Sequence, residues 1–195
     1  MSEGRYRAFL DTVLRTDPRP PLVSVYHAVR NIPYGSTGVR DPAEVIRKDL
    51  GSCSGKHLLL RDLLRMQGFD TEIITIFTYF NRGVPVHESF PEALRRLCLE
   101  TDIPDYHHYV RIRRDGDWIK LDATWHDALV PYGFPVNADW QGEGDTTLAA
   151  EPLEEYPNVE DLIAYKKALI DAMSAEDRER RARFFRLITE WIAGL

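Results

Sequence analysis

A cysteine stands at the predicted start of a helix, in the segment Gly51-Ser52-Cys53-Ser54-Gly55-Lys56. The Leu-rich run that follows has apolar residues at helical spacing and predicts a buried helix from Cys53 to Gln67. Unpartnered N–H groups and the positive end of the helix dipole favour an anion there, which lowers the pKa of a thiol. The flanking glycines would let a substrate backbone approach, and the Cys53 N–H could donate to an oxyanion. The alternative is an inert, buried structural cysteine, and this segment alone does not decide between the two.

Two later segments supply a histidine and then an aspartate. His107 precedes a strand predicted at Tyr109–Arg113, and Asp122 ends a strand predicted at Trp118–Leu121. Asp115-Gly116 between them is a two-residue hairpin signal, so the strands should pair antiparallel and bring Asp122 across from His107. His107 could then act as a general base that Asp122 orients. The alternatives are that Asp122 caps the following turn and that His107 is a packed core side chain.

Together, these segments resemble the transglutaminase-like superfamily. The chain has Gly51-Ser52-Cys53 before a Leu-rich helix, then His107-x-Tyr109-Val110-x-Ile112, then Gly116-x-Trp118-x-x-x-Asp122-x-Thr124, in the family's order of Cys, His and Asp. The family's histidine aligns with His107, and Ala123 stands where the family has proline. The likeness covers about residues 40 to 125, and the tract from Gly133 to Thr147 also resembles that of small bacterial members of unknown function.

The resemblance implies a papain-like α+β fold, with Cys53, His107 and Asp122 as a catalytic triad. The activity implied is thiol-dependent acyl chemistry on an amide-type bond, by a peptidase, an amidase or an acyltransferase. We favour hydrolysis because water needs no second binding site, although the same triad serves transfer. The expected partner is a peptide, protein or small amide substrate, and no cofactor is implied. The alternative is a non-catalytic binding or scaffold module that kept the fold, which would show a broken triad or a blocked cleft.

Other residues compete with these or depart from the family pattern. Lys56 stands where the family often has an acidic residue, and it would further favour a thiolate if it pointed at the site. His57 lies one helical turn after Cys53 and is a rival base, but it would leave little room for a substrate, so we expect a packing role. His108 should point to the opposite face of its strand, and Cys98 is expected in the core.

The predicted elements around these residues follow an α+β pattern, with helices first and strands later. A further strand is predicted at Thr71–Tyr79, and helices are predicted at Tyr6–Leu14, Leu22–Ile32, Asp41–Leu50, Pro91–Leu99 and, in two pieces, Val159–Ile192. A long loop spans Trp125–Pro157, and its aromatic residues either wall a cleft or pin the loop onto the core. We expect helices packed on a small antiparallel sheet, in one domain over 1–195 with a core of about 21–125. The rest, about 126–195, would be a C-terminal loop and helical extension.

Composition excludes several other classes of protein. The chain has 195 residues, a formal net charge of −6 and two cysteines, with 44% hydrophobic and 29% charged residues. An acidic chain is a poor candidate for binding nucleic acids or anionic membranes. Two cysteines cannot build a disulfide framework, and with adjacent histidines they form no closed zinc pattern, so we expect no metal. The N-terminus shows no signal peptide, and we expect a cytoplasmic protein with reduced thiols.

Overall fold

The structure is a computed structural model that describes residues 2–195. Its centre is a four-stranded antiparallel sheet in the order β3-β2-β1-β4. The strands are β1 (Thr71–Tyr79), β2 (Pro104–Arg114), β3 (Asp117–Leu121) and β4 (Glu154–Tyr156). β2 begins five residues before the predicted strand, because β1 pairs with it along its whole length, from Thr71↔Ile112 to Tyr79↔Pro104. His107 therefore lies within a central strand rather than at its start.

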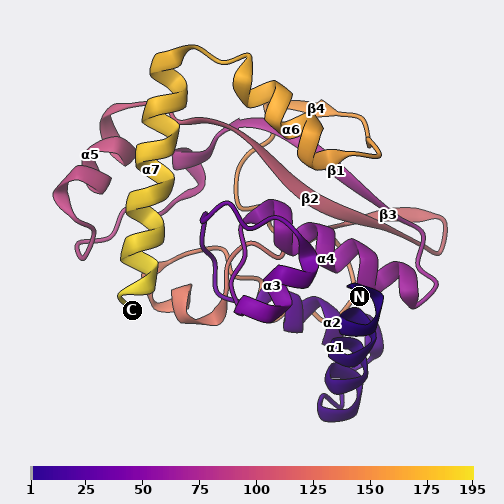
Figure 1. The fold of residues 1–195 in the computed structure, drawn as a ribbon. Helices are drawn as coiled ribbons and strands as arrows, with labels where there is room; N and C mark the ends of the chain where they lie inside the picture. The colour runs from indigo at the N-terminus through magenta and orange to yellow at the C-terminus, as the bar shows by residue number, and fades with distance from the viewer. Residues whose placement is uncertain (1) are drawn as a thin grey trace.

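Seven α-helices surround this sheet in the described part of the chain (Figure 1). They are α1 (Ser2–Thr16), α2 (Pro21–Arg30), α3 (Pro42–Lys48), α4 (Cys53–Met66), α5 (Glu92–Glu100), α6 (Leu162–Asp171) and α7 (Ala175–Ala193). Two short 3₁₀ helices, η1 (Phe80–Gly83) and η2 (Asp127–Tyr132), lie in the connections. The expected α+β class is confirmed, with helices packed on a small antiparallel sheet and further helices at the C-terminal end.

The first helices begin where the sequence signals are strongest. Pro42 occupies the first turn of α3, and the Asp41 carboxylate accepts a 2.8 Å hydrogen bond from the Ala43 N–H. This is the predicted combination of an Asp cap followed by Pro. α4 begins at Cys53, as predicted, and its first residues, through Leu60, are buried. A helix enclosed in this way holds its N-terminus in a fixed position inside the protein.

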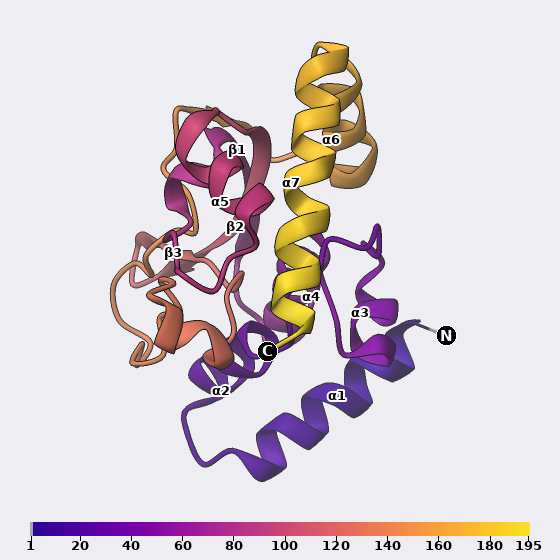
Figure 2. The ribbon, with the colours of Figure 1, turned by 90° about the vertical axis from the view of Figure 1, so that its left-hand side faces the viewer.

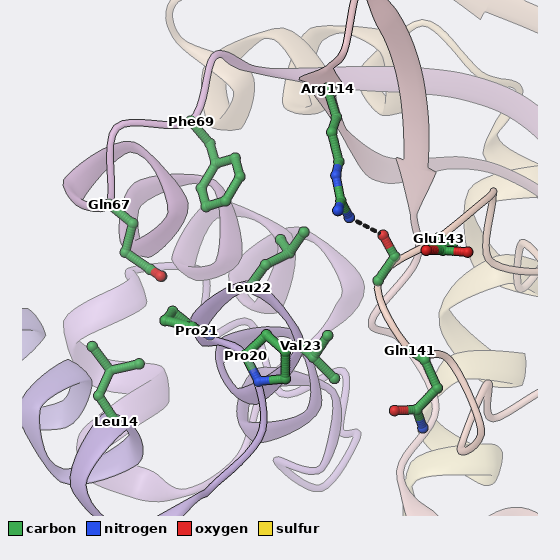
Figure 3. A pocket seen from close by; sticks show the side chains of 11 residues that line it. Leu14, Pro20, Pro21, Leu22, Val23, Gln67, Phe69, Arg114, Gln141 and Glu143 are labelled. Carbon is green, nitrogen blue, oxygen red and sulfur yellow. Dashed lines mark hydrogen bonds between the residues drawn. The ribbon is translucent and has the colours of Figure 1, made fainter.

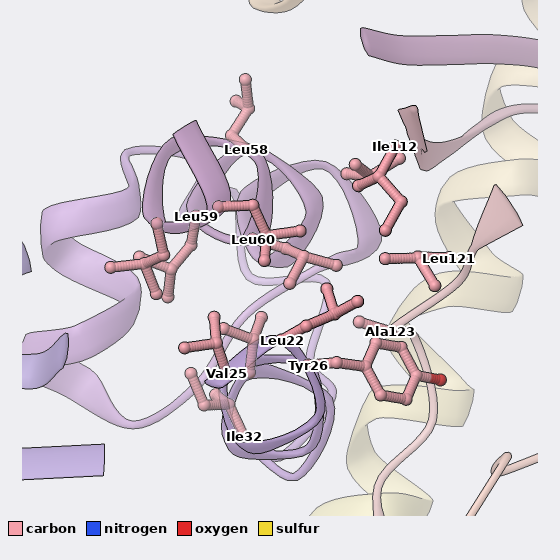
Figure 4. Packing of buried hydrophobic residues seen from close by; sticks show 14 of the residues in the cluster. Leu22, Val25, Tyr26, Ile32, Leu58, Leu59, Leu60, Ile112, Leu121 and Ala123 are labelled. Carbon is pink, nitrogen blue, oxygen red and sulfur yellow. The ribbon is translucent and has the colours of Figure 1, made fainter. Parts of the chain in front are cut away.

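The larger apolar cluster joins α4 to α2 and to the sheet. Leu59 and Leu60 of α4 lie between side chains of α2 and residues of β2 and β3, among them Ile112 and Leu121 (Figure 4). All four of these side chains are fully buried. Burying side chains of this size contributes about 1.5–3 kcal/mol each, so this cluster fixes α4 against the strands that hold His107 and Asp122.

A second apolar cluster joins Cys53 to the C-terminal helix. It includes Phe80, Trp125 and the α7 residues Phe184 and Phe185. In Figure 2 the strands lie on the left, while α3, α4, α6 and α7 lie together on the right. The helical extension predicted after residue 126 therefore packs beside the start of α4.

The long loop between β3 and β4 is held against the core by its own residues. Trp125 and Phe134 pack in the second cluster, while Trp140 packs in the first. Leu148 contacts a small group on the sheet, formed by Ile74, Ile76 and Tyr109. These aromatic residues pin the loop to the core, as one of the two sequence interpretations held. Within residues 2–195 no helix is both long enough and apolar enough to cross a membrane.

Candidate active site

The hairpin between β2 and β3 brings Asp122 to His107. Asp115 and Gly116 both have positive φ, 53° and 98°, the conformation that a two-residue turn of this kind requires. The register pairs Val110 with Leu121, so Asp122 emerges beside the His107 end of β2. The predicted strand pairing is therefore the arrangement in the structure.

Asp122 accepts a hydrogen bond from His107. The distance from His107 Nε2 to Asp122 Oδ2 is 2.8 Å, and both side chains are buried. A carboxylate only accepts, so Nε2 bears the proton and Nδ1 is left to exchange a proton with another group. Nδ1 has no well-formed hydrogen bond within residues 2–195. This is the tautomer that a Cys–His–Asp triad requires.

Asp122 is also held by backbone N–H groups. Thr124 donates to Oδ1 at 2.9 Å, and Ala149 donates to Oδ2 at 2.8 Å. The Asp122 carboxylate therefore does both things that the sequence suggested as alternatives: it caps the following turn through Thr124 and it accepts the hydrogen bond from His107. Ala149 comes from the long loop, so that loop helps to position and bury the acid. The loop also supplies Thr146, whose hydroxyl accepts a 2.7 Å hydrogen bond from the Asp122 N–H.

Opposing effects set the charges of the histidine and the aspartate. Burial lowers the pKa of His107, but the charge and hydrogen bond of Asp122 and contact with Cys53 outweigh it and raise this pKa to about 10. Burial raises the pKa of Asp122, but the charge of His107 and the hydrogen bond that His107 donates hold this pKa well below its usual range. At neutral pH the pair is therefore an imidazolium and a carboxylate.

Cys53 lies at the first position of α4 and interacts with His107. Burial raises the pKa of the Cys53 thiol, but the Lys166 ammonium and the nearby His107 lower it to about 7. Cys98 lies on α5, half-buried rather than in the core, and burial raises its pKa to about 11. The two thiols therefore differ, and Cys53 is the one with thiolate character at neutral pH.

His57 supports the backbone turn that follows Asp122. Its Nε2 accepts a 2.8 Å hydrogen bond from the Ala123 N–H and lies 3.5 Å from Asp122 Oδ1. Burial is the largest influence on the pKa of His57 and lowers it, so the ring is neutral at neutral pH. His108 bonds Thr75 through Nδ1 at 3.1 Å, away from Asp122. His107 is thus the histidine that donates a hydrogen bond to Asp122, and it also lies near Cys53.

Lys56 directs its donors to backbone carbonyls and not to the thiol, so the condition under which it would favour the thiolate is not met. Its fully buried ammonium donates to the carbonyls of Arg30, Ile32 and Thr124 at 2.7–2.9 Å. Lys56 follows Cys53 by three residues in α4, and its side chain runs toward the C-terminal end of α2 and the turn after Asp122. Lys56 therefore joins these segments where their backbone carbonyls would otherwise lack donors.

The glycines around Cys53 face the protein rather than a substrate. A Cβ on Gly55 would lie 2.8 Å from Val45 Cγ2, and one on Gly51 would lie 2.9 Å from Lys56 Cγ. Both glycines are therefore needed for close packing of α3 and Lys56 against the start of α4. The expectation that these glycines admit a substrate backbone is therefore wrong, since they make room for Val45 and Lys56 instead.

Lys166 of α6 lies beside Cys53, and none of the sequence motifs predicted this residue at the site. Its Nζ lies 3.8 Å from Cys53 Sγ, 3.4 Å from Ser54 Oγ and 3.8 Å from Asp105 Oδ2. The sequence did place Lys166 four residues after Leu162, on the same face of α6, and these two are the buried residues of that helix. Its partner could not be read from the sequence, because Lys166 follows Cys53 by 113 residues.

The candidate site formed by Cys53, His107 and Asp122 is enclosed by the protein. Cys53 is 3% exposed and His107 is 0% exposed. A surface cavity of about 740 Å³ lies elsewhere, lined by residues such as Leu22, Phe69 and Arg114 (Figure 3). No triad residue lines this cavity. Among residues 2–195, no group of three or more His, Cys, Asp or Glu side chains is placed to hold a metal ion.

Comparisons with known proteins add little to this geometry. No protein-family model matches the chain, and no curated protein matches it in sequence. A similar solved structure is that of a proposed cysteine protease from Cytophaga hutchinsonii, with 14% identity and a TM-score of 0.46. The match covers 81% of this chain and 45% of that one, so the chain spans less than half of that protein's length. A likeness this distant has no weight for activity, which has to be judged from the side chains of the site.

Proposed function

We propose that this protein is a cysteine hydrolase or acyltransferase of the transglutaminase-like kind. The observation that supports it best is the 2.8 Å hydrogen bond from His107 Nε2 to Asp122 Oδ2, next to a cysteine at a helix N-terminus. This combination presents a thiol, a proton carrier and an orienting acid in one buried cluster. The proposal includes Cys53, His107 and Asp122 as the catalytic residues and a peptide, protein or small amide as the substrate.

The proposed reaction begins with the Cys53 thiolate and the His107 imidazolium. The sulfur attacks the carbonyl carbon of an amide, and the carbonyl electrons move to the oxygen. When the C–N bond breaks, His107 gives its proton to the leaving amine, and a thioester remains. Water, or an amine in the transfer reaction, then attacks the thioester carbonyl while neutral His107 accepts its proton; the C–S bond breaks, the acid or the new amide leaves, and the Cys53 thiolate and the His107 imidazolium are restored. The unpartnered N–H groups at the start of α4 are suited to stabilise the oxyanion.

A non-catalytic module with the same fold is the second candidate, and the burial of Cys53 favours it. An enclosed thiol has to become accessible before any acyl donor can reach it. The catalytic proposal therefore requires that Cys53 becomes exposed by a local opening of the structure, and enzymes make such motions on microsecond to millisecond timescales.

The two candidates separate in one experiment. Wild-type protein and the C53S variant are incubated with peptide amides, aryl amides and thioesters, each with and without a primary amine. Turnover and intact mass are recorded. The catalytic proposal expects turnover and a mass increase from the acyl group on wild-type protein only. Equal turnover by C53S would exclude Cys53 as the nucleophile, whereas a folded wild-type protein that shows no turnover and forms no adduct at Cys53 with any acyl donor would support the non-catalytic module.

A further inference from the structure

A lysine in the interior of a protein is costly unless it has partners. Lys166 is 3% exposed and lies on the inward-facing side of α6, where the helix pattern would call for an apolar residue. Its neighbour Lys167 has a side chain that is 70% exposed and pairs with Asp171 on the surface. The position of Lys166 therefore has to be explained by the groups that receive its three N–H donors.

Three groups surround the Lys166 ammonium. They are the Cys53 sulfur, the Ser54 hydroxyl and the Asp105 carboxylate. Asp105 is already the partner of Arg181, whose Nε donates to Oδ1 at 2.6 Å. One carboxylate therefore faces two cations, and a second anion is needed to balance them. The closest group that can become that anion is Cys53.

The other charges around the thiol are consistent with this count. The His107 imidazolium is balanced by Asp122 through their hydrogen bond. The groups that act on Cys53 from the surrounding elements are Lys166 of α6, Arg181 of α7, Asp105 and His107 of β2, Lys56 of α4, and Tyr34. The Lys56 ammonium donates three hydrogen bonds to backbone carbonyls, so Lys166 is the lysine that contacts the sulfur.

We infer that Lys166 is a second cationic partner of the Cys53 thiolate, held in place by Asp105 and Ser54. This inference rests on the proposed function for its catalytic meaning, but the ion pair itself does not require turnover. When the Cys53 thiol loses its proton, the sulfur gains a negative charge that Lys166 and the His107 imidazolium share. In a triad without this lysine, the imidazolium alone would stabilise the thiolate. The C-terminal helical extension would thus supply a residue of the reactive centre.

Thiol titration tests this without a substrate. The thiolate absorbance of Cys53 is followed against pH as a difference from the C53S variant, for wild type, K166M, K166R and K167M. Met keeps the long apolar stem of Lys166 and removes the charge. K166M should raise the midpoint by at least about one pH unit, which is a tenfold fall in the ratio of thiolate to thiol at pH 7. K166R should stay closer to wild type, and K167M, the matched surface control, should be unchanged.

A structural role would give a different result. If Lys166 only joins α6 to β2, K166M lowers stability but leaves the Cys53 midpoint at the wild-type value, and the inference is overturned. Should K166M fail to fold, K166Q is titrated in the same way, because Gln also lacks the charge. A raised Cys53 midpoint in K166Q supports the pairing, whereas an unchanged midpoint contradicts it. Absence of amide turnover would count against the proposed function only.

Discussion

His107 and Asp122 are joined by a 2.8 Å hydrogen bond between Nε2 and Oδ2, in the interior of the protein and 15 residues apart in sequence. The tight turn at Asp115-Gly116 makes this contact possible, because it returns β3 alongside β2. The same Asp122 carboxylate also accepts hydrogen bonds from Thr124 and Ala149. Orientation of the histidine and stability of the turn therefore depend on one side chain.

Substitution of Asp122 by Asn should affect both properties. In D122N the amide nitrogen cannot accept, so either His107 and the Ala149 N–H lose their acceptor at Oδ2 or the Thr124 N–H loses its acceptor at Oδ1, and the imidazolium loses its counter-ion. Breaking a buried pair in this way costs about 3–5 kcal/mol. Urea unfolding should show that loss, and any acyl turnover should fall by orders of magnitude, as when the acid of a triad is made neutral. Stability and turnover equal to wild type would exclude Asp122 from both roles.

The choice of base between His107 and His57 can be tested by paired substitutions. H107Q removes the proton carrier, so turnover should be lost and the Cys53 thiol pKa should rise. H57Q keeps a side-chain acceptor for the Ala123 N–H, and turnover should stay within about tenfold of wild type, since a packing residue misplaces the site only slightly. Turnover lost in H57Q but retained in H107Q would reverse the assignment.

Alkylation of the two cysteines should follow different pH profiles. The pKa of Cys53 is lowered to about 7, so its thiolate persists to lower pH than an ordinary thiol's, and its rate should rise with pH up to a plateau with a midpoint near 7. The pKa of Cys98 is raised to about 11, so its rate should still be rising at pH 9. Iodoacetamide rates resolved by peptide mass spectrometry measure both sites, with C53S and C98S assigning them. A Cys53 midpoint at or above 8.5 would contradict an activated thiol.

Removal of Lys56 should destabilise the protein severely. K56M leaves three buried carbonyls without their donor, and an unsatisfied buried polar group costs about 1–3 kcal/mol. We expect the free energy of unfolding to fall by at least about 3 kcal/mol in urea titrations. K48M, on the exposed last turn of α3, serves as the matched control and should change stability by less than about 0.5 kcal/mol. A K56M variant as stable as K48M would mean that water replaces the lost donor.

Local patterns in the sequence were enough to predict the main elements and the order of the triad candidates. The start of α4 at Cys53, strand β1 at Thr71–Tyr79 and the hairpin at Asp115-Gly116 are all in the structure. Each depends on interactions within a few residues: helical periodicity, β-branched composition and a turn that needs positive φ. The contact between His107 and Asp122 also follows from such local rules, because only one short turn separates their strands.

Only the tertiary structure decided which side chains complete and enclose the site. Lys166 and Ala149 reach Cys53 and Asp122 because α6 and the long loop fold back onto the sheet, and Lys56 turns to the end of α2 instead of the thiol. These positions depend on packing between segments far apart in the chain, which no periodicity encodes. A lysine in a helical sequence can be exposed to solvent or buried beside an anionic partner. Which of the two occurs depends on whether the surface against which that helix packs carries an anionic group.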